Sequence, residues 1–198
     1  MNIPNIRYTI SFILAATVFL ESLAYGQNGG NPEINFAVTR EGEFIQTEAR
    51  VDLPVSPAVA WAVLTDYERY PRFISSMRQS RIVSRNTEGL IVEQKGRFSF
   101  LFFSQEIDVR LQVSEFPAKV VESRAIDGDF RVMNGRYELI PRGNSVRLSY
   151  SGRLAPNFGL PPIFGLRIVR YILFRNFSEM VNEILRRDAA TKANPTAG

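Results

Sequence analysis

The sequence predicts an α+β fold in which a curved antiparallel β-sheet wraps around one long C-terminal helix. Three observations lead to this prediction. Between residues 89 and 154 apolar and polar side chains alternate along several runs, which is typical of half-buried strands. Short turn sequences separate these runs, so neighbouring strands are expected to pair as an antiparallel meander. After Pro162 the apolar residues change to helical spacing.

The first 26 residues have the layout of a secretory signal peptide. A short segment with one arginine precedes the uncharged run Ile10–Leu20, and the small residues Ala24 and Gly26 suit a cleavage site. The alternative is an uncleaved N-terminal anchor. Cleavage is favoured because this run is shorter than the roughly 20 residues that a membrane-spanning helix needs. We therefore expect the leader to be cleaved and the protein to act outside the cytoplasm, in the periplasm if the organism is a Gram-negative bacterium. Residues 27–42 are interpreted as a polar leader.

The folded domain is expected to cover residues 43–190 and to open with a strand and two short helices. Gln46–Leu53 alternates as a strand. Ser56 can accept hydrogen bonds from the free N–H groups of a helix start, and Pro57 suits its first position. The sequence Thr65–Tyr67 ends this helix, and a second short helix follows it.

Paired strands and a long helix make up the rest of the domain. The extended runs are Arg81–Arg85, Gly89–Phe98, Phe102–Val113, Ala118–Ile126, Phe130–Ile140 and Ser145–Leu154. Asp127–Asp129 encloses a glycine and predicts a tight turn. Apolar residues then recur at helical spacing at Val169, Leu173, Phe177, Met180 and Ile184. The helix is expected to end near Arg187, before a disordered tail at residues 191–198.

A sheet with one wet face needs an apolar cover on its other face. The long helix is the only predicted element large enough to supply that cover. A curled sheet and a single helix can leave a gap between them, and this gap is the candidate binding site.

The composition excludes several classes of chemistry. The chain has no histidine and no cysteine, so the common zinc, iron–sulfur and blue-copper sites lack their ligands. Ser–His–Asp and Cys–His catalysis are excluded for the same reason. We expect no metal and no cofactor. The net charge of +4 is spread along the chain, which favours a solvated surface over nucleic-acid binding.

The order of strand, two short helices, meander and long helix resembles the START-like (SRPBCC, helix-grip) superfamily. The run Val59, Trp61, Leu64–Tyr67 and Tyr70–Phe73 resembles its polyketide cyclase/dehydrase and lipid-transport branch, which includes coenzyme Q-binding START domains. The resemblance covers about Glu43–Arg187. It implies a deep cavity between sheet and helix that holds a lipid, a quinone or another hydrophobic molecule. It brings no shared catalytic triad, so no catalytic residue is expected.

Strand alternation places a few polar side chains on the apolar faces. They are Gln94, Gln105, Tyr137 and Tyr150, and we expect them to orient the polar end of a ligand. The alternative is a closed core in which they bond to one another or to the backbone. Arg175, in the long helix, either reaches into the cavity to hold a polar group or extends to solvent.

Two apolar stretches lie where polar loops are expected, at Phe98–Phe103 and at Ala155–Gly165. Such stretches form a gate over a pocket, contact a membrane or partner, or fold back onto the sheet. The residues expected to form the gate or the membrane contact are Phe100, Phe102, Phe158 and Phe164.

The leading hypothesis is a periplasmic, non-catalytic carrier or sensor that binds a hydrophobic small molecule, which is a lipid, a quinone or a polyketide-like compound. One alternative is a cyclase or dehydratase acting on a polyketide-like or aromatic substrate. Such chemistry needs a general acid or base beside the substrate, and the assigned inward faces carry no Asp, Glu or Lys. Another alternative is a module that docks on a membrane or a protein.

Overall fold

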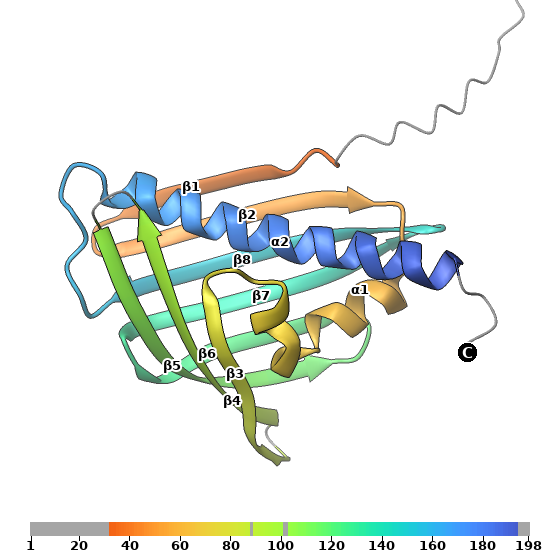
Figure 1. Cartoon of the computed structure of the whole chain (residues 1–198), viewed down its shortest axis with the longest axis horizontal. Helices are drawn as coiled ribbons and strands as arrows, with labels where there is room; N and C mark the ends of the chain where they lie inside the picture. Colours follow the sequence, from red (N-terminus) through yellow and green to blue (C-terminus); the bar gives the residue numbers. More distant parts are fainter. Residues whose placement is uncertain (1–31, 88, 101–102, 194–198) are drawn as a thin grey trace, which may run out of the picture. The chain divides into compact units, whose positions relative to one another are not determined.

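In the described part of the chain, eight antiparallel strands form one sheet, and the C-terminal helix lies across its concave face, as the computed structural model shows (Figure 1). The structure describes residues 32–87, 89–100 and 103–193. The predicted signal peptide, residues 1–26, lies outside the described residues. The strand order in the sheet is β1-β2-β8-β7-β6-β5-β4-β3.

The bounds of the elements follow the predicted order. They are β1 (Asn35–Glu41), β2 (Phe44–Leu53), α1 (Pro57–Leu64), η1 (Tyr67–Arg72), β3 (Met77–Asn86), β4 (Gly89–Phe100), β5 (Phe103–Phe116), β6 (Val120–Gly128), β7 (Phe130–Arg142), β8 (Ser145–Pro156) and α2 (Gly165–Ala193). Strands β3 to β8 form the expected meander, and β2 closes onto β8. The α+β prediction with two short helices and one long helix is therefore confirmed.

The sheet begins earlier than the expected domain start at residue 43. Strand β1 lies inside the segment interpreted as a polar leader, and it pairs with β2 from Asn35 to Glu41. It is an edge strand in which only Phe36 and Val38 are partly buried, so its apolar pattern is weak. Gly42, at φ +60°, makes the tight turn into β2.

Helix α2 also runs further than expected. It continues to Ala193, into the segment predicted as a disordered tail, and residues 194–198 lie outside the described residues. No helix in the described ranges is both long enough and apolar enough to cross a membrane.

The start of α1 forms as the sequence predicts. The Ser56 hydroxyl accepts a hydrogen bond from the Val59 N–H at 3.3 Å, and Pro57 occupies the first turn. The Tyr70 hydroxyl of η1 donates to the Leu64 carbonyl at the end of α1. This bond ties η1, which lies against β3, to the end of α1.

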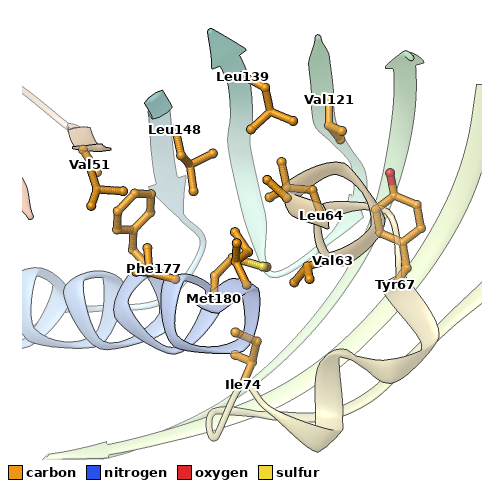
Figure 2. Close-up of a cluster of buried hydrophobic side chains, with 14 of the residues drawn as sticks. Val51, Val63, Leu64, Tyr67, Ile74, Val121, Leu139, Leu148, Phe177 and Met180 are labelled. Atoms are coloured by element: carbon orange, nitrogen blue, oxygen red, sulfur yellow. The ribbon is translucent and has the colours of Figure 1, made fainter. Parts of the chain in front are cut away.

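The core lies between the sheet, α1 and α2. Figure 2 shows Phe177 and Met180 of α2 pointing toward Val51 and Leu148 on the sheet. In the same view, Leu64 of α1 lies on the side of Met180 that faces away from Phe177. All five side chains are almost fully buried. Breaks in the strand register, between Ile82 and Ser84 for example, bend the sheet around this core.

Candidate functional site

A cavity of about 170 Å³ lies between the concave face of the sheet, η1 and α2. Most of its wall is apolar: Ile74, Met77, Leu111, Val113, Val121, Met133, Leu173, Phe177 and Met180. The polar residues in the wall are Tyr67, Tyr70, Gln94, Ser123, Tyr137, Tyr150 and Asn176. An apolar wall with a few placed polar groups is typical of a site for a small hydrophobic molecule.

The structure brings three of the predicted ligand-binding residues together in this wall, namely Gln94, Tyr137 and Tyr150. Gln105 lies elsewhere. It faces inward, as the alternation predicts, but pairs with Phe98 near the end of the β4–β5 hairpin. Its amide donates to the Glu106 carbonyl at 2.7 Å. Strand alternation indicates the face of a residue but not its distance from the helix that closes the cavity.

Tyr137 and Tyr150 form the polar centre of the wall. They are direct partners on β7 and β8, and their ring centroids lie 4.7 Å apart. Phe177 stacks parallel to Tyr137 at 6.5 Å from the other side. Within the described residues neither tyrosine hydroxyl makes a hydrogen bond, so both are available to a ligand.

Burial keeps these phenols neutral. It raises the pKa of Tyr150 to about 12 and raises the pKa of Tyr137 well above its ordinary value, with the neighbouring Tyr150 adding to the effect. A neutral phenol both donates and accepts hydrogen bonds. The pair can therefore bind a carbonyl or a hydroxyl oxygen but is a poor general base at neutral pH.

Two amides extend the polar side of the wall. The Ser76 hydroxyl donates to Asn176 Oδ1 at 2.9 Å, and Gln94 Nε2 donates to the Ser80 hydroxyl at 3.3 Å. Each bond uses one end of its amide and fixes the side chain. Within the described residues, the Asn176 amino group and the Gln94 side-chain carbonyl make no hydrogen bond. The site thus presents a donor and an acceptor besides the two phenols.

Several wall residues were not predicted as site residues. Tyr67 and Tyr70 both belong to η1, and both residues border the cavity. Asn176 lies on the inward stripe of α2, three residues after Leu173, and this spacing is a signal that the sequence contains. Ser123 lies two residues after Val121 on β6 and therefore shares its inward face, so it could have been found in the same way.

Arg175 does not border the cavity. Its guanidinium lies 5.5 Å from the centre of the Tyr171 ring. Its Nε is buried and has no hydrogen-bond partner among the described residues. Arg175 is half-buried outside the wall of the cavity, and the alternative that its side chain extends to solvent stays a prediction.

The residues expected to form a gate differ in position. Phe158 folds inward, with its ring 6.0 Å from Phe130 and 6.3 Å from Phe98. Phe164 stays exposed, together with Ile163. The side chain of Phe100 and the whole of Phe102 lie outside the described residues. The loop between β8 and α2 therefore has one aromatic residue packed beneath it and an apolar tip in solvent.

A larger hollow of about 720 Å³ lies on the opposite, outer face of the sheet. Its wall is polar and charged, and two of its residues, Arg136 and Glu122, form an ion pair. This open and polar hollow suits water, and the smaller apolar cavity is the better candidate for a ligand. In the described ranges no three carboxylates gather closely enough to hold a metal ion.

Comparisons with known proteins agree with this architecture. Residues 53–180 match the family described as polyketide cyclase / dehydrase and lipid transport. No curated protein matches the chain in sequence.

Solved structures with the same fold have low identity to the chain. A START superfamily protein from Mycobacterium smegmatis is 15% identical with a TM-score of 0.58, over 73% of this chain and 97% of that one. The Zhui aromatase/cyclase from a Streptomyces species is 15% identical with a TM-score of 0.60, over 78% and 99%. A STAR-related lipid transfer protein from Xanthomonas axonopodis is 12% identical with a TM-score of 0.60, over 76% and 93%.

At such identities the likeness shows the fold alone, which is the START-like helix-grip fold. The family match spans more than half of the chain, from the end of β2 into α2. The chain therefore belongs to the polyketide cyclase/dehydrase and lipid-transport family.

Proposed function

We propose that this protein binds and carries a small hydrophobic molecule, a lipid or a quinone, in the cavity between the sheet and α2. The wall of that cavity is the observation that supports the proposal most strongly. It combines apolar side chains with two phenols and two amides that still have hydrogen-bonding capacity. A ligand with a compact polar end and an apolar body satisfies both parts of this wall.

The volume of the cavity limits what fits. An engineered apolar cavity of about 150 Å³ holds a benzene ring, whereas drug-sized ligands occupy roughly 300–1,000 Å³. The 170 Å³ observed here therefore suits a single ring or a group of similar size. A quinone head or the ring of a polyketide-like compound meets this limit.

Binding without chemistry is favoured over a cyclase or dehydratase activity. The described wall of the cavity contains no Asp, Glu, Lys or Arg. Its tyrosines have raised pKa values because they are buried, so they hold their protons at neutral pH. The Tyr67 hydroxyl donates a hydrogen bond to the Glu115 carboxylate at 2.8 Å, so its proton is already engaged by that partner.

Location and membrane contact complete the proposal. The signal-peptide layout of the first 26 residues supports export to the periplasm. Ile163 is 82% exposed and its neighbour Phe164 is exposed as well, while Tyr171 and Phe174 are exposed further along α2. Exposed Arg167 and Arg170 accompany them, and such a mixture suits an anionic bilayer surface, where a hydrophobic ligand would be collected.

Native mass spectrometry of the protein purified from its own periplasm, followed by organic extraction, tests the proposal. We expect the mature chain without its leader and one reproducible bound molecule of ring-containing, apolar character. Met133→Trp, which fills the cavity from β7, is the matched variant and should carry none. Wild-type protein that is empty and also ignores a panel of lipids and quinones would contradict the proposal.

A further inference from the structure

A second, smaller pocket adjoins the cavity beneath the loop between β8 and α2. Its volume is about 60 Å³, and its wall is entirely apolar. The residues that matter here are Phe98, Phe130, Phe158, Leu160, Ile172 and Leu173. The ring contacts of Phe158 with Phe130 and Phe98 form its roof.

Leu173 connects the two spaces. Among the described residues it is the one that borders both the cavity and the apolar pocket. Its side chain is half-buried, while its neighbour Ile172 is buried on the pocket side. A leucine on a helix has two accessible χ1 orientations, so a change of rotamer at Leu173 can join the pocket to the cavity.

The two spaces differ in chemistry. The cavity carries the phenols of Tyr137 and Tyr150 and the amides of Gln94 and Asn176, whereas the pocket offers no polar atom. A pocket without polar groups stays dry and takes up hydrocarbon. This contrast matches a molecule with a polar ring at one end and an alkyl chain at the other.

We propose that the ligand is a ring-headed amphiphile whose head lies against Tyr137 and Tyr150 and whose alkyl tail passes Leu173 into the pocket beneath the loop. This inference rests on the proposed function and adds the class of ligand and the path of its tail. At roughly 30 Å³ for a water-sized group, the pocket holds about two methylene groups. Each buried methylene strengthens binding roughly fourfold.

A homologous series of 4-alkylphenols, from phenol to 4-octylphenol, provides the test by isothermal titration calorimetry. For the wild-type protein we expect the affinity to rise about fourfold for each added methylene and then to level off once the pocket is full. Leu173→Trp should lose most of the rise in affinity with chain length, measured relative to its own affinity for phenol. Leu173→Met, which keeps the volume and flexibility of the side chain, is the matched control and should retain the rise.

A second variant covers the case in which Leu173→Trp fails to fold. Leu160→Ala enlarges the pocket from the loop side and should move the plateau to longer chains. The inference would be overturned if the affinity of wild type did not rise with chain length, or if it rose equally in folded Leu173→Trp. In either case, binding of phenol to wild type would still support the cavity as the ligand site. If phenol itself does not bind to wild type, the proposed function and this inference fail together.

Discussion

The ring of Tyr150 lies across Gly152, its neighbour two residues further along β8. A Cβ atom at Gly152 would stand 2.5 Å from the Tyr150 hydroxyl oxygen and 2.8 Å from its Cζ, closer than real Cβ contacts allow. Gly152 pairs with Gly135 on β7, and a Cβ there would lie 3.3 Å from the same oxygen. The two glycines thus leave this part of the sheet without side chains. The Tyr150 ring lies over it and contacts the ring of Tyr137.

This relationship predicts the effect of Gly152→Ala. The new methyl group would push the Tyr150 ring toward the cavity, and overpacking of this kind costs roughly 1–3 kcal/mol of unfolding free energy. Urea denaturation measures the loss, and phenol binding should weaken in parallel. Gly159→Ala, which has open space around it, is the matched control. Equal stability of the two variants would show that Tyr150 is not fixed by Gly152.

A second prediction concerns alkaline pH. The pKa of Tyr150 is raised from 10.0 to about 12 by burial, so the folded state holds its proton while the unfolded state loses it. The free energy of unfolding should therefore be fully retained below pH 10 and fall by roughly 1–2 kcal/mol between pH 10 and 12. Tyr150→Phe should reduce this fall. Denaturation curves of wild type and Tyr150→Phe across this range measure the difference, and an equal fall in the two proteins would refute the prediction.

A third prediction concerns acid. Glu183 of α2 is buried, and its carboxylate accepts hydrogen bonds from Arg186 at 2.6 Å and Arg187 at 2.7 Å. The Arg186 bond is the main cause of its lowered pKa, and Arg187 also pairs with Asp66 at the start of η1. The stabilisation is present above the ordinary pKa of the glutamate and is lost as the pH falls through the lowered one.

Glu183→Gln should therefore lower the free energy of unfolding by roughly 1–3 kcal/mol near neutral pH and reduce its fall between about pH 5 and 3. Glu68→Gln, at an exposed position on η1, is the control and should change neither. Denaturant unfolding at a series of pH values measures both effects. If Glu183→Gln unfolds with the same free energy as wild type, the hydrogen bonds of Arg186 and Arg187 to Glu183 do not stabilise the fold.

The fourth prediction tests the membrane surface. Ile163→Asp combined with Phe164→Ser should reduce sedimentation with anionic lipid vesicles several-fold, because two apolar groups at the tip of the loop are lost. Val83→Asp, at a similarly exposed apolar residue on β3, should bind vesicles as wild type does. Circular dichroism confirms that each variant is folded. If all three proteins sediment alike, the apolar tip is not the contact.

Much of the fold is predictable because its signals are local. The cap at Ser56, the alternation of β4 to β8 and the helical spacing of α2 each follow from a few neighbouring residues. Strand β1 escaped prediction because an edge strand exposed on most positions has little apolar pattern. Its place in the sheet depends on pairing with β2, which supplies the backbone hydrogen bonds.

The site was predictable only in part. Gln94, Tyr137 and Tyr150 could be assigned to an inward face, but the exclusion of Gln105 depends on where α2 crosses the sheet. The double role of Leu173 depends on the loop that folds beneath it, as does the inward turn of Phe158. These are long-range relationships, and no local pattern in the sequence encodes them.

The methionines offer the most direct measurement of the central claim. Beyond the predicted leader the chain has Met77, Met133 and Met180, and all three line the cavity. In protein labelled with ¹³C at the methionine methyl groups, titration with 4-ethylphenol should shift all three NMR signals together along one saturable curve. Two results would contradict a ligand site between the sheet and α2. The signals could shift without reaching saturation, or all three could stay in place while the ligand binds elsewhere on the protein.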